Sequence, residues 1–128
     1  MTRLARLKVR RDFLAAAKGL KFIRRGLVLQ ALDKTADADA TDIRYGLTVT
    51  KKVGNAVIRN RVRRRLRAVA AELLPQKGKS GFDYVLIGRV TTLDRPYHKL
   101  AKDLETALER VHDMASHPEF ASVEETAK

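Results

Sequence analysis

The chain has no cysteine, so disulfide bonds and thiolate metal sites are excluded, as is usual for proteins of a reducing cytosol. No apolar run approaches the roughly 20 residues that a membrane-spanning helix needs. The segment Met1–Arg11 also lacks the apolar stretch of a secretory signal. Its arginine-rich start could imitate an organelle presequence, but the core-like residues Asp12-Phe13-Leu14 of a predicted helix follow directly. These absences predict a cytoplasmic protein with no membrane partner.

Acidic residues are missing from the centre of the chain. From Ile43 to Ala71 there are none, whereas nine residues are basic. Over all 128 residues, 27 Lys and Arg face 15 Asp and Glu, which gives a net charge of +12. With 45% apolar residues the chain is long enough for one folded domain with a core. This charge on a folded domain favours a polyanionic partner, with RNA or DNA as the first candidates.

The chemistry of an independent nuclease is also missing. Such an enzyme needs carboxylates arranged for metal ions, or a histidine pair for acid–base catalysis. Seven of the 15 acidic residues lie in the polar loop Lys34–Asp42 and in the last predicted helix, away from the basic centre. His98, His112 and His117 have no strong metal-ligand pattern, and each is interpreted as a surface residue. The sequence therefore predicts no catalytic residue and no metal site in this chain.

Hydrophobic periodicity and turn residues predict one domain over residues 1–115, followed by a polar tail over 116–128. The two strands on either side of the acidic loop are expected to form an antiparallel pair. Asn55 is predicted to cap the arginine-rich helix and Pro75 to stop it, whereas Asp94 caps the last helix with Pro96 near its first position. The predicted elements are a helix over Leu7–Lys18, strands over Gly26–Asp33 and Ile43–Thr50, a helix from Asn55 to about Leu74, a strand over Phe82–Gly88 and a final helix to about Val111.

The arginine-rich helix has two different faces. With residues about 100° apart, one apolar stripe forms the predicted core contact. The opposite side and both flanks are cationic, and arginines one turn apart repel each other without an acidic neighbour. A planar guanidinium can bind phosphate oxygens in pairs or stack on bases, which favours RNA. The stripe comprises Ile58, Val62, Leu66, Val69 and Leu73; the polar side comprises Asn60, Arg63, Arg64 and Arg67, with Arg59 on one flank and Arg61 and Arg65 on the other.

Two motifs together resemble the bacterial ribonuclease P protein component. They are the segment Gly46–Ala56, which contains the Lys51-Lys52 turn, and the Arg-Asn-Arg helix Arg59–Arg67. The likeness extends to Arg11-Asp12-Phe13 and to Asp83–Ile87, and it covers most of Leu7–Val111. It implies an α+β fold, a two-layer α–β sandwich in the order helix, three strands, helix, strand, helix. Lys21–Arg24 would supply the third strand before the arginine-rich helix. The likeness also implies a left-handed strand–helix–strand crossover, where the general rule favours a right-handed one.

The resemblance implies that this chain is the protein subunit of ribonuclease P. In that family a catalytic RNA removes the 5′ leader of precursor tRNA with Mg2+ held mainly by the RNA, and the protein helps to bind the leader. The implied partners are therefore the ribonuclease P RNA and precursor tRNA, with no obligate protein partner. Carried over by position, the contacts to the catalytic RNA are Lys51, Lys52, Arg59, Asn60, Arg61, Arg63, Arg64 and Arg67.

The resemblance also implies a leader-binding cleft between the first helix and the open face of the sheet. It places Phe13, Val28 and Gln30 there. This chain has Ala17 where relatives carry a second aromatic residue, and Gln30 where an aromatic residue occurs, so leader contact is expected to be weaker or shifted toward Phe22. Phe13 could equally be a core residue.

Three other functions fit parts of the pattern. A general structural RNA-binding protein of ribosomal type would need the basic face, but not the Lys-Lys turn followed by the Arg-Asn-Arg helix. An independent nuclease lacks its catalytic groups. A DNA-reading helix is disfavoured because the arginines surround much of the helix rather than lining one edge.

Overall fold

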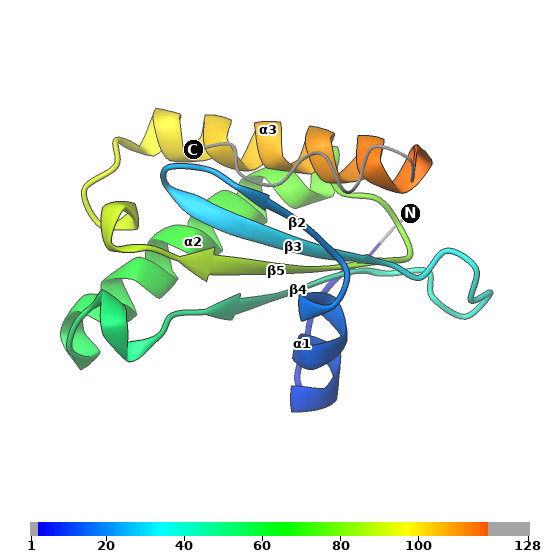
Figure 1. Ribbon diagram of the computed structural model, residues 1–128, viewed down its shortest axis with the longest axis horizontal. Helices are drawn as coiled ribbons and strands as arrows, with labels where there is room; N and C mark the ends of the chain where they lie inside the picture. The colour runs from blue at the N-terminus through cyan, green and yellow to red at the C-terminus, as the bar shows by residue number, and fades with distance from the viewer. Residues whose placement is uncertain (1–2, 118–128) are drawn as a thin grey trace.

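The computed structural model describes residues 3–117. Its layers are seen in Figure 1, where α2 and α3 lie on one side of the sheet and α1 lies on the other. The elements are β1 (Leu4–Arg6), α1 (Arg10–Ala17), β2 (Leu20–Ile23), β3 (Leu27–Asp33), β4 (Ile43–Thr48), the 3-10 turn η1 (Lys51–Val53), α2 (Ala56–Lys77), β5 (Phe82–Gly88), the 3-10 turn η2 (Val90–Thr92) and α3 (Tyr97–Ser116). The predicted order of helices and strands is confirmed, with the short β1 added in front.

The strands form one five-stranded sheet in the order β1-β4-β5-β3-β2. The predicted antiparallel pairing of β3 with β4 is wrong, because β5 lies between them. β5 pairs antiparallel with β3 and parallel with β4. A parallel neighbour requires a crossover, and α2 supplies it between β4 and β5. The left-handed sense of this crossover stays a prediction.

The two faces of the sheet differ in what covers them. On β3 the alternate residues Leu27, Leu29 and Ala31 are buried against α2 and α3, and this side is called the core face. The intervening residues Val28 and Gln30 are only partly buried. They lie on the opposite side, called the α1 face, to which Arg44, Gly46, Thr48, Val85 and Ile87 also belong by strand register. Because α1 is short, it covers only part of that face.

The helix boundaries correct three predictions. α2 continues through Pro75 to Lys77, so this proline does not stop it. α3 begins at Tyr97 with Pro96 as its N-cap, and Asp94 does not cap it. The first helix begins at Arg10, three residues later than predicted, because Leu4–Arg6 form β1. α3 reaches Ser116, the first residue of the predicted tail, and residues 118–128 lie outside the described part of the chain.

Candidate RNA-binding surface

A tight basic turn leads into α2. Its last residue, Gly54, has a φ of 156°, and a Cβ there would lie only 2.8 Å from Ile58 Cγ2. Glycine is therefore required for this close approach. The side chain of Asn55 then accepts a hydrogen bond from the Ile58 amide at 2.9 Å, which confirms the predicted cap. The turn places Lys51 and Lys52, both exposed, beside the first turn of the helix.

The apolar stripe of α2 fixes which way its arginines point. Val62, Leu66 and Val69 are fully buried in the core, as predicted, and Ala70 and Leu74 join them. Ile58 and Leu73, at the edges of the stripe, are half-buried and pack against the core. The helix cannot rotate without exposing these residues, so its remaining faces are held towards solvent.

The outward residues form the arginine surface, a name used here for the eight residues predicted to contact RNA. Arg59 is half-buried and donates from Nε to the Gly54 carbonyl at 3.2 Å, and Arg63 donates from Nη1 to the Asn60 amide oxygen at 3.1 Å. Among residues 3–117 none of the eight has an acidic partner. The structure brings all eight together on η1 and on residues 59–67 of α2: Lys51, Lys52, Arg59, Asn60, Arg61, Arg63, Arg64 and Arg67.

Arg65 differs from its neighbours on the same helix. Its Nη2 donates to the carbonyl of Arg95, and its Nε is buried without a hydrogen-bond partner in the described structure. Nearby, Tyr97 donates to Glu72 at 2.6 Å, which connects α2 to the first residue of α3. Arg65 therefore joins α2 to the segment just before α3 and does not belong to the arginine surface.

The second predicted site is on the α1 face. The ring of Phe13 lies on the backbone of Gly46, where a Cβ would come within 2.5 Å of two ring atoms. Val28 and Gln30 lie on the same side of the sheet and are half-buried. Phe22 does not join them, and the prediction that groups it with the cleft is wrong in geometry. It pairs with Leu29 on the core face, is 3% exposed, and packs under the guanidinium of Arg110.

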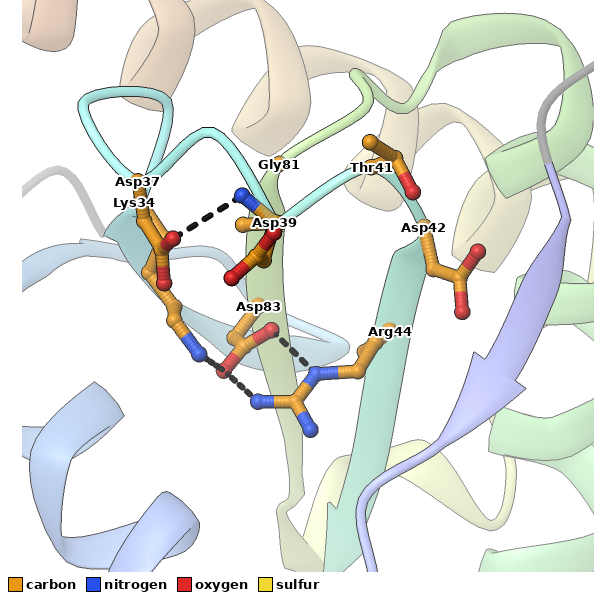
Figure 2. Close-up of a pocket in the computed structure, with 9 residues that line it drawn as sticks. Lys34, Asp37, Asp39, Thr41, Asp42, Arg44, Gly81 and Asp83 are labelled. Carbon is orange, nitrogen blue, oxygen red and sulfur yellow. Dashed lines mark hydrogen bonds and ion pairs between the residues drawn. The ribbon is translucent and has the colours of Figure 1, made fainter.

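An ion-pair cluster at the edge of the α1 face was missed from the sequence (Figure 2). Asp83 is 3% exposed and receives two hydrogen bonds from Arg44, at 2.8 Å from Nε and 2.6 Å from Nη2. Lys34 Nζ lies 3.7 Å from the same carboxylate. The hydrogen bonds that Arg44 donates to Asp83 raise the pKa of Arg44 above its ordinary value. The sequence does carry a signal for this cluster, which is the charged residue Asp83 at the start of the apolar strand Phe82–Gly88. A carboxylate buried in such a strand needs a cationic partner.

One histidine was also misplaced. His112 is buried, not a surface residue as predicted, and it forms a 2.6 Å hydrogen bond with the Tyr84 hydroxyl. Within residues 3–117, no three His, Asp or Glu side chains form a group that could hold a metal ion. No helix in this part of the chain is long and apolar enough to cross a membrane.

Fold and surface together define a small two-layer α–β protein with an uncompensated cationic helix on its surface. Residues 1–112 match the sequence profile of the family described as Ribonuclease P. The chain belongs to this family. It is 52% identical over 111 residues to the ribonuclease P protein component of Paramagnetospirillum magneticum, covering 85% of this chain and 84% of that protein. The corresponding protein of Erythrobacter litoralis is 45% identical over 112 residues, covering 88% and 89%.

Solved structures agree with the sequence relatives. The ribonuclease P protein of Thermotoga maritima superposes with a TM-score of 0.68 at 25% identity, covering 82% of this chain and 96% of that chain. That of Staphylococcus aureus gives a TM-score of 0.66 at 26% identity, covering 82% and 93%. The predicted fold class and family are thus confirmed.

Proposed function

We propose that this chain works as the RNA-binding subunit of a ribonuclease P whose catalytic centre is formed by its RNA partner. The holoenzyme is an endoribonuclease that matures the 5′ end of tRNA. The arginine surface carries the proposal, because it gathers seven cations with no acidic counter-charge in the described chain. A surface of this kind is stabilised when phosphates replace the missing carboxylates. The proposed assembly forms in the cytoplasm, where its tRNA substrates are made.

The geometry suits the backbone of a folded RNA. Arg61, Arg64 and Arg67 are exposed on α2 and can reach phosphate oxygens with paired donors. Arg59 and Arg63 are partly fixed by their hydrogen bonds to Gly54 and Asn60, so less side-chain freedom is lost on binding. We infer that the buried stripe of the helix orients this surface and that the arginines bind the RNA partner.

The magnesium ions of the proposed enzyme would be bound mainly by the RNA. Mg2+ keeps several waters and is usually bound by one or two carboxylates together with phosphates. The described chain offers no carboxylate cluster of that kind beside the arginine surface, and phosphates of the RNA are the natural ligands. The protein would lower the magnesium requirement by neutralising phosphates that otherwise repel one another.

Precursor tRNA is the proposed substrate, and its 5′ leader would cross the uncovered part of the α1 face. Phe13 at the border offers a ring for base stacking, and the amide of Gln30 offers a donor and an acceptor to a base edge. Val28, two residues before Gln30 on β3, supplies apolar contact on the same face. This chain provides fewer aromatic surfaces than two stacked rings would, so each leader nucleotide is expected to be held weakly.

The test is cleavage of a precursor tRNA by a bacterial ribonuclease P RNA at low Mg2+, with and without the chain. Strong stimulation is expected, and none from the chain without the RNA. A variant with Arg64→Ala and Arg67→Ala should need more protein for the same stimulation. The matched control, Lys99→Ala with Lys102→Ala, removes two exposed cations from α3 and should behave as the parent.

Two results would contradict the proposal. If the RNA bound tightly but cleavage were not stimulated, the chain would be a general RNA-binding protein. If both double variants lost stimulation equally, net charge rather than the arginine surface would govern assembly.

A further inference from the structure

α1 is weakly held by its own contacts. It has only eight residues, its N-cap Val9 makes no side-chain capping bond, and Ala16 is its only fully buried residue. So short a helix is not stable alone and depends on tertiary contacts. Contacts with residues of other elements must therefore hold α1 in its position on the sheet.

A chain of charges supplies one contact. Arg44 is fixed to the buried Asp83 by its two hydrogen bonds, and its remaining nitrogen, Nη1, lies 3.6 Å from the carboxylate of Asp12 in the first turn of α1. Lys34 adds a second cation at Asp83. The guanidinium of Arg44 thus connects the central strand β5 to α1 (Figure 2 shows its attachment to Asp83).

The adjacent contact is apolar. Gly46 lies two residues after Arg44 on β4, so both present the same side of the strand. Arg44 receives Asp12, and the backbone of Gly46 receives the ring of Phe13. Consecutive residues of α1 are therefore seated on consecutive α1-face positions of β4. A shift of the helix along the strand would break both contacts together.

We propose that Arg44 and Asp83 are positioning residues for substrate recognition: they hold α1 through Asp12 and so fix Phe13 at the border of the α1 face. This rests on the proposed function, in which the 5′ leader crosses that face. The cluster would then set the preference for tRNA that carries a leader over mature tRNA. It would leave the contact between α2 and the RNA partner unchanged, because that surface lies on the other layer.

The first test uses Asp12→Asn in the assembled holoenzyme, with affinities measured for precursor tRNA and for mature tRNA. Removing a negative charge should strengthen RNA binding if only long-range electrostatics acted. Positioning requires the opposite: affinity for precursor tRNA should fall about two- to five-fold, the range of one partly exposed ion pair, with mature tRNA unchanged. The matched control Asp39→Asn makes the same charge change in the exposed loop and should not lower the preference.

The second test separates the ion pair from the favourable position of Asp12 at a helix N-terminus. The double variant Arg44→Gln with Asp83→Asn removes the half-buried cation and the buried carboxylate together and keeps Asp12 in place. Its preference for precursor over mature tRNA should fall as much as that of Asp12→Asn. The triple variant with all three changes should show no further loss of this preference. Hydrogen exchange of the α1 amides should quicken in each variant, whereas those of α2 should keep their protection.

The outcomes distinguish the two levels of inference. If the parent holoenzyme does not prefer precursor over mature tRNA, the proposed path of the leader is wrong. If the parent does prefer it and Asp12→Asn keeps the full preference, Arg44 and Asp83 do not position the site. Additive losses from the two sets of changes would likewise overturn the coupling.

Discussion

The buried side chain of His112 gives this protein a pH-dependent stability at the scale of one residue. Burial, and then the charge of Lys79, lower the pKa of His112 to about 4 from 6.5. The unfolded chain therefore binds this proton at a higher pH than the folded chain does. Stability is full above pH 6.5 and falls as the pH drops from 6.5 towards 4, by up to about 3 kcal/mol. Urea unfolding at a series of pH values measures this slope.

The comparison variant is His112→Gln, which cannot take up the proton but still offers polar groups to Tyr84. Its stability should change less than that of the parent between pH 6.5 and 4. His98→Gln alters an exposed histidine on the same helix and should retain the parent slope. An unchanged slope in His112→Gln would mean that other groups cause the loss.

Residue directions on a single helix could be predicted, but contacts between elements could not. The 100° rule placed Val62 and Leu66 in the core and the arginines outside. It could not show that Arg65 reaches the Arg95 carbonyl, because that partner belongs to another element. The predictions for Phe22 and His112 were wrong for the same reason, because the burial of a residue is decided by the layer that covers it.

At the scale of elements, the start of α2 depends on one cap. Asn55→Ala would leave the Ile58 amide without its acceptor and should lower the free energy of unfolding by about 1 kcal/mol. Asn60→Ala is the matched control, because the same change within the exposed helix should be neutral or slightly stabilising. Chemical denaturation of both variants at pH 7 checks this. Equal losses in the two would show that Asn55 acts through something other than capping.

Helix ends were less predictable than helix starts. Asn55 has a specific acceptor role that is visible in the sequence. Pro75 was expected to end α2, but it lies in the last turn, where a missing N–H removes a single bond and the exposed Ala71 carbonyl can be solvated. Asp94 likewise looked like a cap, although the chain turns through η2 and begins α3 only after Pro96.

At the scale of the whole molecule, strand order was the feature that local patterns did not reveal. Strands β3 and β4 are joined by an acidic loop and looked like neighbours, yet β5 enters between them. Side-chain alternation shows which residues of one strand share a face. Strand order depends instead on which long-range pairing of strands buries the most apolar surface. The family resemblance supplied the third strand before α2, whereas the cationic helix was found from the spacing of its arginines and apolar residues.

The net charge of +12 makes RNA binding by the whole molecule depend on salt. Each phosphate neutralised by a cation releases counterions, so the logarithm of affinity should fall linearly and steeply with the logarithm of salt concentration. Each lost contact reduces this slope by about 0.7–0.9, so Arg64→Ala with Arg67→Ala should reduce it by about 1.5. Lys99→Ala with Lys102→Ala removes equal charge from α3 and should leave the slope unchanged, because these lysines belong to another helix and not to the arginine surface. Filter binding to the ribonuclease P RNA between 50 mM and 400 mM salt, as a rough range, measures both slopes. Equal reductions would show that the RNA responds to total charge, and the arginine surface would lose its specific role.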